Sequence, residues 1–336
     1  MNYITYQQKD CFTGCIVNAV RALGKNCTEA EILLKGDGFT IRYKPTVIDG
    51  TPRFLLITEL REACIKYLND NNIIYKEFCG ETLDRARKIV KEAIDLGNIP
   101  LVQIAANSIH YHPVFNQTTN SLHCLNILTV DEDRNIAVVS DGYVPTTPVL
   151  TYDGEMPVSD LEDGYERSER HIFVFSQVKD HNIDDGEEYV SRFEISKIKR
   201  VLTEYMSGGE KEGVFYGISA VKKVFESLES VMDWPKDEFR NKIMDFNNIY
   251  KTWGFISAKR IMAELFYECE CLKQFAEEMN NIAEAWNGLS RMMVKMAIAY
   301  RPSSLLSIKE KVLELTEKEK ELFSAVIGVI EREENK

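Results

Sequence analysis

The chain has 336 residues, of which 44% are hydrophobic and 28% are charged, and this composition is typical of a globular protein rather than a disordered one. Its formal net charge is −12 and both halves are acidic, so nucleic acid is not expected as a partner. No run approaches the roughly 18 apolar residues of a membrane span. The first ten residues, MNYITYQQKD, lack the regions of a signal peptide. We therefore expect a cytoplasmic protein that makes no membrane contact.

The first predicted element is a helix that begins at Cys11. The segment CFTGCIVNAVRALG has apolar residues at helical spacing. A cysteine in the first turn of a helix lies near free amide groups and the positive end of the helix dipole, which lower the pKa of its thiol. We expect Cys11 to be a nucleophile. Cys15 lies one turn later, in register with Ala19 and Val20, and is the alternative.

Helices and then strands follow along the first half. Thr28 and Glu31 form a capping box that opens a short helix, and residues 58–71 and 82–96 have helical spacing. Five short, turn-bounded segments predict strands: IIYKEF (73–78), IPLVQIA (99–105), LHCLNILTV (122–130), RNIAVVSD (134–141) and HIFVFS (171–176). Because helices come mainly first and strands mainly last, the pattern predicts an α+β fold rather than repeated βαβ units.

His123 and Asp141 lie on two successive predicted strands, separated by the acidic turn DEDRN. Antiparallel pairing of these strands would bring the two side chains together. An imidazole beside a thiol can take its proton, and a carboxylate can fix the orientation and tautomer of that imidazole. The order of thiol on a helix, then imidazole, then acid on strands predicts a catalytic triad of Cys11, His123 and Asp141.

The second half loses the strand pattern. The polar segment HNIDDGEE (181–188) is interpreted as a linker, which gives a catalytic domain over 1–180 and a helical domain over 189–336. Apolar residues between Phe255 and Trp286 recur at steps of three or four and predict two successive helices. Ser307 and Glu310 form a capping box for the last helix.

Two groups of residues suggest metal binding but are not favoured. His110 and His112 could join His123 and Asp141 at one ion, yet Pro113 follows them and a cleft edge or loop is the preferred interpretation. Cys269 and Cys271 lie on a predicted helix, where residues two apart point to different faces. The sequence also has no P-loop or dinucleotide fingerprint, so neither a metal nor a cofactor is expected.

The chain resembles the butirosin biosynthesis protein H family. The likeness rests on the run CFTGCIVNAV from Cys11, followed by Leu23-Gly24, Thr28-Glu29, Gly36-Asp-Gly38-Phe39 and Tyr43, and on Pro52-Arg53, Ile99-Pro100-Leu101-Val102 and His123 before an apolar strand. The second half is similar to the helical domain that usually follows in these proteins. The resemblance thus covers nearly the whole chain. It implies a papain-like domain with an antiparallel sheet, followed by an all-α domain.

The resemblance also implies a chemistry. That family transfers an acyl group from the phosphopantetheine thioester of a carrier protein to an amine, in the biosynthesis of antibiotics. It implies a Cys acyl-enzyme, an acyl or peptidyl carrier protein as donor, and a small amine as acceptor. Related leader peptidases place an oxyanion Gln six residues before the Cys, where this chain has Thr5. Gln7 and Gln8 are therefore the side-chain candidates for the oxyanion hole.

Two other functions stay open at this point. A cysteine peptidase or amidase would use the same site with water as acceptor, and a binding protein could keep the fold with a decayed site. A carrier protein is usually acidic, so its docking patch on this acidic chain must be local. Lys197, Lys199 and Arg200 form the cluster where such docking would be sought.

Overall fold

The computed structural model describes residues 3–117, 121–146, 148–176, 193–252 and 254–336. The chain divides into two compact units, one from residues 1–32 with 61–188 and the other from 33–60 with 189–336. The sequence predicted domains 1–180 and 189–336 with a single boundary between them, whereas residues 33–60 belong to the second unit. The two divisions differ because β1 (Ile41–Tyr43) pairs with β12 (Val214–Tyr216), a long-range contact that no local pattern reports. The predicted linker, 181–188, lies outside the described residues.

The first unit is built on a six-stranded antiparallel sheet with the order β5-β10-β6-β7-β8-β9. Its strands are β5 (Tyr75–Cys79), β6 (Ile99–Ala105), β7 (Leu122–Asp131), β8 (Ile136–Val144), β9 (Leu150–Pro157) and β10 (His171–Phe175). Its helices are α1 (Cys11–Ala22), the start of α2 (Glu29–Gly36), α3 (Leu60–Asp70), α4 (Leu83–Asp95) and α5 (Val158–Glu166), with short 3-10 turns η1 (Ala106–Ser108) and η2 (Phe115–Gln117).

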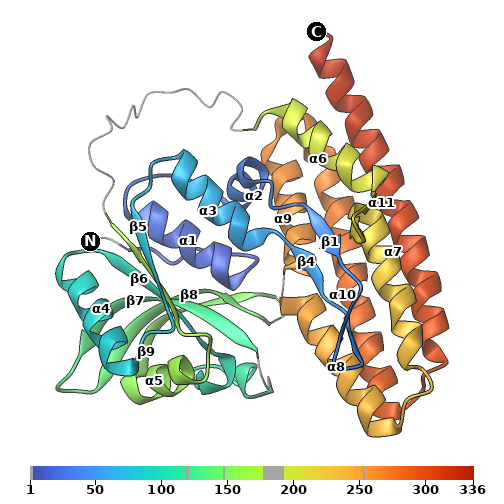
Figure 1. Ribbon diagram of the computed structural model, residues 1–336. Helices are drawn as coiled ribbons and strands as arrows, with labels where there is room; N and C mark the ends of the chain where they lie inside the picture. The colour runs from blue at the N-terminus through green and yellow to red at the C-terminus, as the bar shows by residue number, and fades with distance from the viewer. Residues whose placement is uncertain (1–2, 118–120, 147, 177–192, 253) are drawn as a thin grey trace. The chain divides into compact units, whose positions relative to one another are not determined.

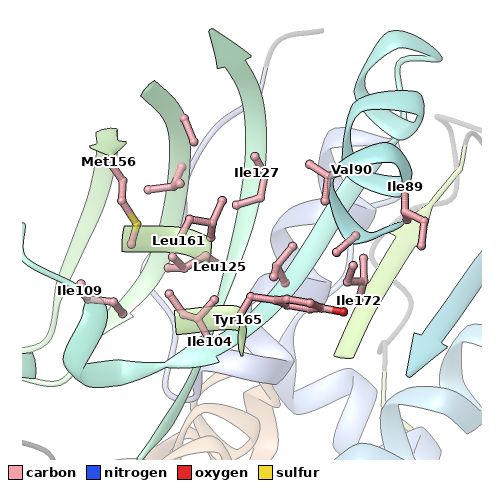
Figure 2. Packing of buried hydrophobic residues seen from close by; sticks show 14 of the residues in the cluster. Ile89, Val90, Ile104, Ile109, Leu125, Ile127, Met156, Leu161, Tyr165 and Ile172 are labelled. Atoms are coloured by element: carbon pink, nitrogen blue, oxygen red, sulfur yellow. The ribbon is translucent and has the colours of Figure 1, made fainter. Parts of the chain in front are cut away.

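Helices cover both faces of this sheet. Helix α1 packs on β7 and β8, while α4 and α5 lie on the opposite face (Figure 1). Figure 2 shows the core beneath α4 and α5, where Val90 and Tyr165 from the helices meet Leu125, Ile127 and Ile172 from the strands. Burial of these side chains fixes the sheet register, because a slip of one residue would turn the apolar set away from the helices.

The α+β prediction is confirmed for this unit. All five predicted strands and the helices over 58–71 and 82–96 are present, with ends shifted by one or a few residues. Thr82 caps α4 by accepting from the amide of Arg85, as its position predicts. Strand β9 and helix α5 were not predicted. The exposed face of β9 and the Gly and Asp residues of α5 leave little apolar periodicity in either segment.

Two glycines allow α1 to approach the sheet closely. A Cβ on Gly14 would lie 2.6 Å from Cβ of Gln8, and a Cβ on Gly142 would lie 2.7 Å from the carbonyl oxygen of Tyr6 and 2.8 Å from Nδ2 of Asn18. The chain before α1 is also tied to β8 directly, because the amide of Gln8 donates to the carbonyl of Gly142 at 2.8 Å. This contact places the first turn of α1 beside the ends of β7 and β8.

The second unit is mainly helical. Its helices are α6 (Ile195–Ser207), α7 (Gly217–Ser227), α8 (Lys236–Thr252), α9 (Phe255–Glu268), α10 (Ala276–Ala299) and α11 (Ser304–Glu334), with 3-10 turns η3 (Leu228–Val231) and η4 (Glu270–Phe275). It also holds a four-stranded sheet in the order β11-β12-β1-β4 and a separate β2-β3 hairpin. The remaining strands are β2 (Thr46–Ile48), β3 (Thr51–Arg53), β4 (Leu56–Thr58) and β11 (Gly209–Lys211).

Two sequence expectations need correction in this unit, and a third is confirmed. The unit is not all-α, because the short hairpin of β11 and β12 interrupts the helices, and three-residue strands are too short to give a periodic pattern. Ser307 does not cap the last helix, which already begins one turn earlier at Ser304. The two helices predicted between Phe255 and Trp286 are present as α9 and α10.

A buried ion pair joins the helices of this second unit. Lys259 of α9 contacts Glu319 of α11 at 2.7 Å, and the indole of Trp286 donates to the same carboxylate oxygen at 2.8 Å. The hydroxyl of Tyr205 donates to the other oxygen. A buried charge is tolerated when it is paired and hydrogen-bonded in this way. Among the described residues, the helices include none with the length and apolar content needed to cross a membrane.

The close approach at Gly142 gives the first prediction. We expect Gly142→Ala to lower the free energy of unfolding by about 1–3 kcal/mol, because the added methyl meets backbone that cannot move aside. Gly288→Ala is the matched control, since the nearest atom to its Cβ is the end of Arg291 at 3.9 Å and alanine favours a helix. Urea unfolding measures both changes. Equal stability of Gly142→Ala and the wild type would contradict this packing.

Candidate functional site

The start of α1 is held by two buried acidic residues. The carboxylate of Asp10 caps the helix by accepting from the amides of Phe12 and Thr13 at 3.0 and 3.1 Å. Glu29 accepts from the amides of Lys9 and Asp10 at 2.7 and 3.1 Å. Burial raises the pKa of Asp10, and the bonds from Thr13 and Phe12 oppose this rise. The turn that carries Cys11 is therefore fixed by hydrogen bonds on its outer side.

His123 and Asp141 meet across the pair of strands β7 and β8. Nε2 of His123 lies 2.8 Å from Oδ2 of Asp141, and both side chains are almost fully buried. Since a carboxylate only accepts, Nε2 carries the proton in this bond and Nδ1 is the nitrogen that remains for the thiol. His123 and Asp141, which are eighteen residues apart in the sequence, thus lie side by side in the structure, as their predicted strands suggested.

Asp141 has two further hydrogen bonds. The hydroxyl of Tyr111 donates to Oδ2 at 2.7 Å, and the amide of Tyr143 donates to Oδ1 at 2.8 Å. The ring of Tyr111 is stacked on Tyr152 with centroids 3.8 Å apart. Burial and the charge of Asp141 raise the pKa of Tyr111, so it remains a donor. Three donors therefore hold the carboxylate that orients His123.

Cys11 and His123 interact at the N-terminus of α1. Burial alone would lower the pKa of His123, but the charge of Asp141, the charge of Cys11 and hydrogen bonds to both raise it to about 10. The pKa of Cys11 is raised well above its usual value by a hydrogen bond to the thiol of Cys124 and by burial, while His123 acts in the lowering direction. The lowered thiol pKa expected from the helix position is therefore wrong, because the Cys124 thiol and burial act in the raising direction.

These shifts assign the proton to His123 when the pair reacts. An imidazole with a pKa near 10 is a strong base for a neighbouring thiol, and its charge stabilises the thiolate that it creates. The site can therefore form a thiolate and imidazolium pair by local proton transfer, without a low intrinsic pKa at Cys11.

Cys15 occupies a different environment from Cys11. Its side chain is 1% exposed, and its thiol donates to the carbonyl of Cys124 at 3.2 Å. Burial raises the pKa of Cys15 well above its usual value, and the charge of Asp141 adds to the rise. Cys11 is partly exposed by contrast. The geometry therefore favours Cys11 over Cys15 as the reactive thiol.

The two candidate oxyanion glutamines lie differently. Gln8 is buried, and its Nε2 lies 3.3 Å from Oδ1 of Asn18 on the same side of α1 as Gly14. Gln7 is exposed. Thr5, at the position of the glutamine of related peptidases, bonds to Ser140 at 2.7 Å. The amide of Cys11 is not part of the Asp10 cap and remains the backbone candidate for an oxyanion donor.

In the segment from His110 to His112, the tyrosine is part of the candidate site and the two histidines are not. Tyr111 points to Asp141, while Nδ1 of His112 accepts from the amide of Val114 at 3.2 Å and His110 is exposed. Among the described residues, the side chains close enough to share an ion do not include these two histidines. Cys269 and Cys271 do not share a helix either, because Cys269 lies between the end of α9 at Glu268 and the start of η4 at Glu270, and Cys271 lies in η4. Their sulfurs are 3.6 Å apart.

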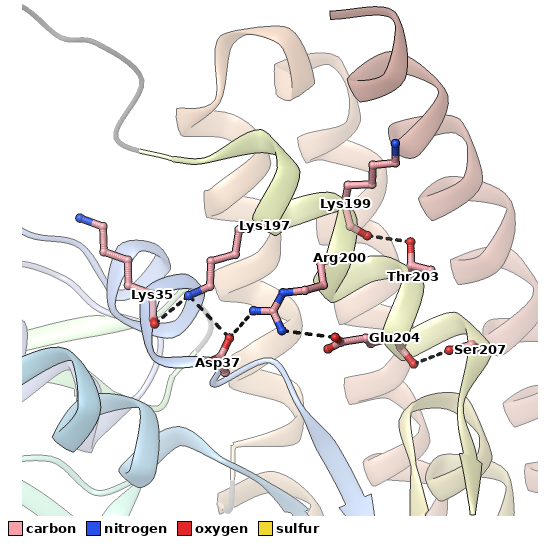
Figure 3. A network of polar contacts seen from close by, with 8 residues as sticks. All are labelled: Lys35, Asp37, Lys197, Lys199, Arg200, Thr203, Glu204 and Ser207. Carbon is pink, nitrogen blue, oxygen red and sulfur yellow. Dashed lines mark hydrogen bonds and ion pairs between the residues drawn. The ribbon is translucent and has the colours of Figure 1, made fainter. Parts of the chain in front are cut away.

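The basic cluster of the second unit is occupied by ion pairs. Lys197 and Arg200 both contact Asp37, at 3.6 and 2.7 Å, and Arg200 also contacts Glu204 at 3.2 Å (Figure 3). Lys199 contacts Glu331 and Glu334 at 3.2 and 3.0 Å. These acidic partners neutralise most of the positive charge, so the cluster is a poor attractor for an acidic carrier protein.

Comparisons with known proteins place few limits on this site. No family model matches the chain, and no curated protein matches it either. One solved structure found in the comparison is a protein from Bacillus anthracis described as a C39-like peptidase. It is 11% identical, and the match covers 52% of this chain and 94% of that one with a TM-score of 0.35. A likeness this distant carries no argument, so the interpretation of the site rests on its own geometry.

Sequence reasoning missed three residues of the site. Glu29 enters the sequence pattern only through the resemblance at Thr28-Glu29, although its carboxylate holds the turn before Cys11. Tyr111 lies between the two histidines considered as metal ligands, and no local pattern singles out Cys124. The one available signal was that Cys124 follows His123 directly in the strand, which places its backbone beside the site.

The bond from Tyr111 gives the second prediction. We expect Tyr111→Phe to slow alkylation of Cys11 by about tenfold at neutral pH, because the loss of a hydrogen bond to a charged group costs roughly 1.5 kcal/mol and leaves Asp141 less well held. The phenyl ring preserves the stack on Tyr152. Tyr152→Phe is the control, since that hydroxyl donates to the carbonyl of Glu155 instead. Equal slowing by both variants would contradict a specific role of Tyr111.

Proposed function

We propose that this protein is a cysteine-dependent acyltransferase that forms amides, with Cys11 as nucleophile, His123 as proton carrier and Asp141 as the group that orients His123. The observation that carries the proposal is the chain of contacts from Asp141 to His123 at 2.8 Å and from His123 to Cys11 at the start of α1. Nucleophile, base and orienting acid in this order form the general arrangement for covalent catalysis by a thiol.

The first half-reaction forms the acyl-enzyme. His123 holds the proton of the Cys11 thiol at Nδ1, and the Cys11 thiolate adds to the carbonyl carbon of the donor thioester. In this proposal the amide of Cys11 donates to the oxyanion. The bond from the carbonyl carbon to the pantetheine sulfur then breaks, and the imidazolium returns its proton to the departing thiolate. A thioester on Cys11 and a free pantetheine thiol result.

The second half-reaction releases the product. An amine attacks the thioester on Cys11 and loses a proton to His123, and the Cys11 thiolate departs. An amide forms, and the pair of Cys11 thiolate and His123 imidazolium is restored. Asp141 stabilises the imidazolium during both proton transfers, because its charge raises the pKa of His123. No cofactor enters this scheme, since the energy of the amide comes from the thioester.

The choice of a carrier-protein donor rests on the resemblance to the butirosin biosynthesis protein H family. That family uses an acyl group on a phosphopantetheinyl carrier and an amine acceptor in antibiotic biosynthesis. A cysteine peptidase or amidase would use the same three residues with water as acceptor. The distinction lies in whether an amine outcompetes water at the acyl-enzyme.

An acylation experiment tests the proposal. The enzyme is mixed with an acylated carrier protein, and intact mass is recorded before and after addition of an amine. We expect a mass increase of one acyl group on the wild type and on Cys15→Ala, and none on Cys11→Ala. The increase should disappear on addition of the amine, with appearance of the amide.

The same experiment separates the alternatives. An acyl-enzyme that yields only the free acid at high amine concentration would identify a hydrolase. Labelling of Cys11→Ala but not of Cys15→Ala would contradict the choice of nucleophile. A wild type that acquires no acyl group from carrier or small thioesters would leave a non-catalytic binding protein as the better interpretation.

A further inference from the structure

A second group of reactive side chains lies on strands β5 and β10 of the first unit. Cys79 is directly opposite His171 in the antiparallel register, and Glu77 lies two residues before Cys79 on the same strand. Residues two apart on a strand share a face, as do direct cross-strand partners. The thiol, imidazole and carboxylate therefore project from one face of two hydrogen-bonded strands.

The spacing of the three ligand atoms is close to that of a tetrahedral zinc site. Sγ of Cys79 lies 3.4 Å from Oε1 of Glu77 and 4.0 Å from Nδ1 of His171, and that nitrogen lies 3.6 Å from the same oxygen. Zinc bonds of about 2.3 Å to sulfur and about 2.0–2.2 Å to nitrogen and oxygen, set at tetrahedral angles, place ligand atoms roughly 3.4–3.6 Å apart. Only the sulfur to nitrogen distance exceeds this range.

We propose that Glu77, Cys79 and His171 form a binding site for Zn²⁺ with three protein ligands and a fourth position open to water. Thiolate, imidazole and carboxylate together favour zinc over calcium or magnesium, which prefer oxygen ligands alone. Binding releases the proton of the Cys79 thiol to solvent, because the thiolate is the metal ligand. Cys79 is exposed, so an ion reaches it directly from solution.

Backbone pairing holds the three ligands in place, but Arg61 competes with a bound cation for one of them. Five consecutive residue pairs join β5 to β10, from Tyr75 to Cys79. The ligands are thus held by backbone pairing rather than by a loop. The guanidinium of Arg61, on α3, contacts the same Oε1 of Glu77 that faces the other two ligands. A bound cation must displace Arg61 from this oxygen or share the carboxylate with it, so Arg61 weakens the affinity for zinc.

The site is independent of the proposed acyl transfer, and its test uses Co²⁺ as a spectroscopic stand-in for Zn²⁺. The full chain carries Cys11→Ser, which removes the partly exposed thiol beside His123. We expect Co²⁺ to produce the near-ultraviolet band of a thiolate-bound ion, and Zn²⁺ to abolish it by competition. The band should be absent in Cys79→Ser. His171→Ala should lower the affinity more than a hundredfold, beyond the roughly 10–100-fold cost of losing an outer partner.

Two further variants make the test specific. Cys271→Ser is the matched control, because it removes another partly exposed thiol and should leave the band unchanged. Arg61→Gln should tighten Co²⁺ binding severalfold, since it removes a positive charge beside the ion; a merely structural effect would not increase affinity. A band that survives Cys79→Ser, that requires Cys271, or that is absent from the parent protein would overturn the proposal.

Discussion

The candidate site depends on how closely α1 lies against the sheet. Gly14 and Gly142 leave no space for a Cβ on either side of the contact, and Gln8 fills the remaining gap while its amide bonds to β8. Interiors are packed densely enough that even one added methyl would push the helix outward. An outward shift would separate the thiol at the start of α1 from the imidazole on β7. Glycine at these two positions is therefore a condition for the chemistry.

Electrostatics in this site do not follow from the helix dipole alone. The first turn of α1 offers amide groups to a thiolate, but Cys124 and burial raise the pKa of Cys11 well above its usual value. His123 favours the thiolate instead, because the charges of Asp141 and Cys11 and the hydrogen bonds to both raise the pKa of His123 to about 10. Proton transfer from Cys11 to His123 therefore forms the thiolate, and the imidazolium stabilises it as an ion pair. Asp141 can serve this purpose because Tyr111, Tyr143 and His123 satisfy it.

The sequence predicted the elements that have strong local patterns. The five strands of the first half, the helix at Cys11 and the placement of His123 and Asp141 on neighbouring strands all follow from periodicity and turn signals. It could not predict that residues 33–60 join the second unit, because β1 pairs with a strand more than 170 residues away. Nor could it predict Glu29 or Tyr111, whose roles come from tertiary contacts alone.

The basic cluster shows a further limit of sequence reasoning. Lys197, Lys199 and Arg200 read as a free positive patch along the chain, yet each meets an acidic side chain from another part of the second unit. On a chain with a net charge of −12, isolated cations are surrounded by partners, and a charge count in a short window overstates the local potential. Recognition of a carrier protein would therefore need contacts other than this cluster.

The central claim is that Cys11, His123 and Asp141 act as one electrostatic unit. Nitrogen NMR of labelled imidazoles, followed through a pH titration, measures this directly, with the five histidines resolved by substitution. We expect His123 to stay protonated through neutral pH and to lose its proton near pH 10, with its pKa falling in Cys11→Ala and falling further when Asp141→Asn is added. A His123 pKa near the ordinary 6.5 that neither substitution changes would contradict the claim.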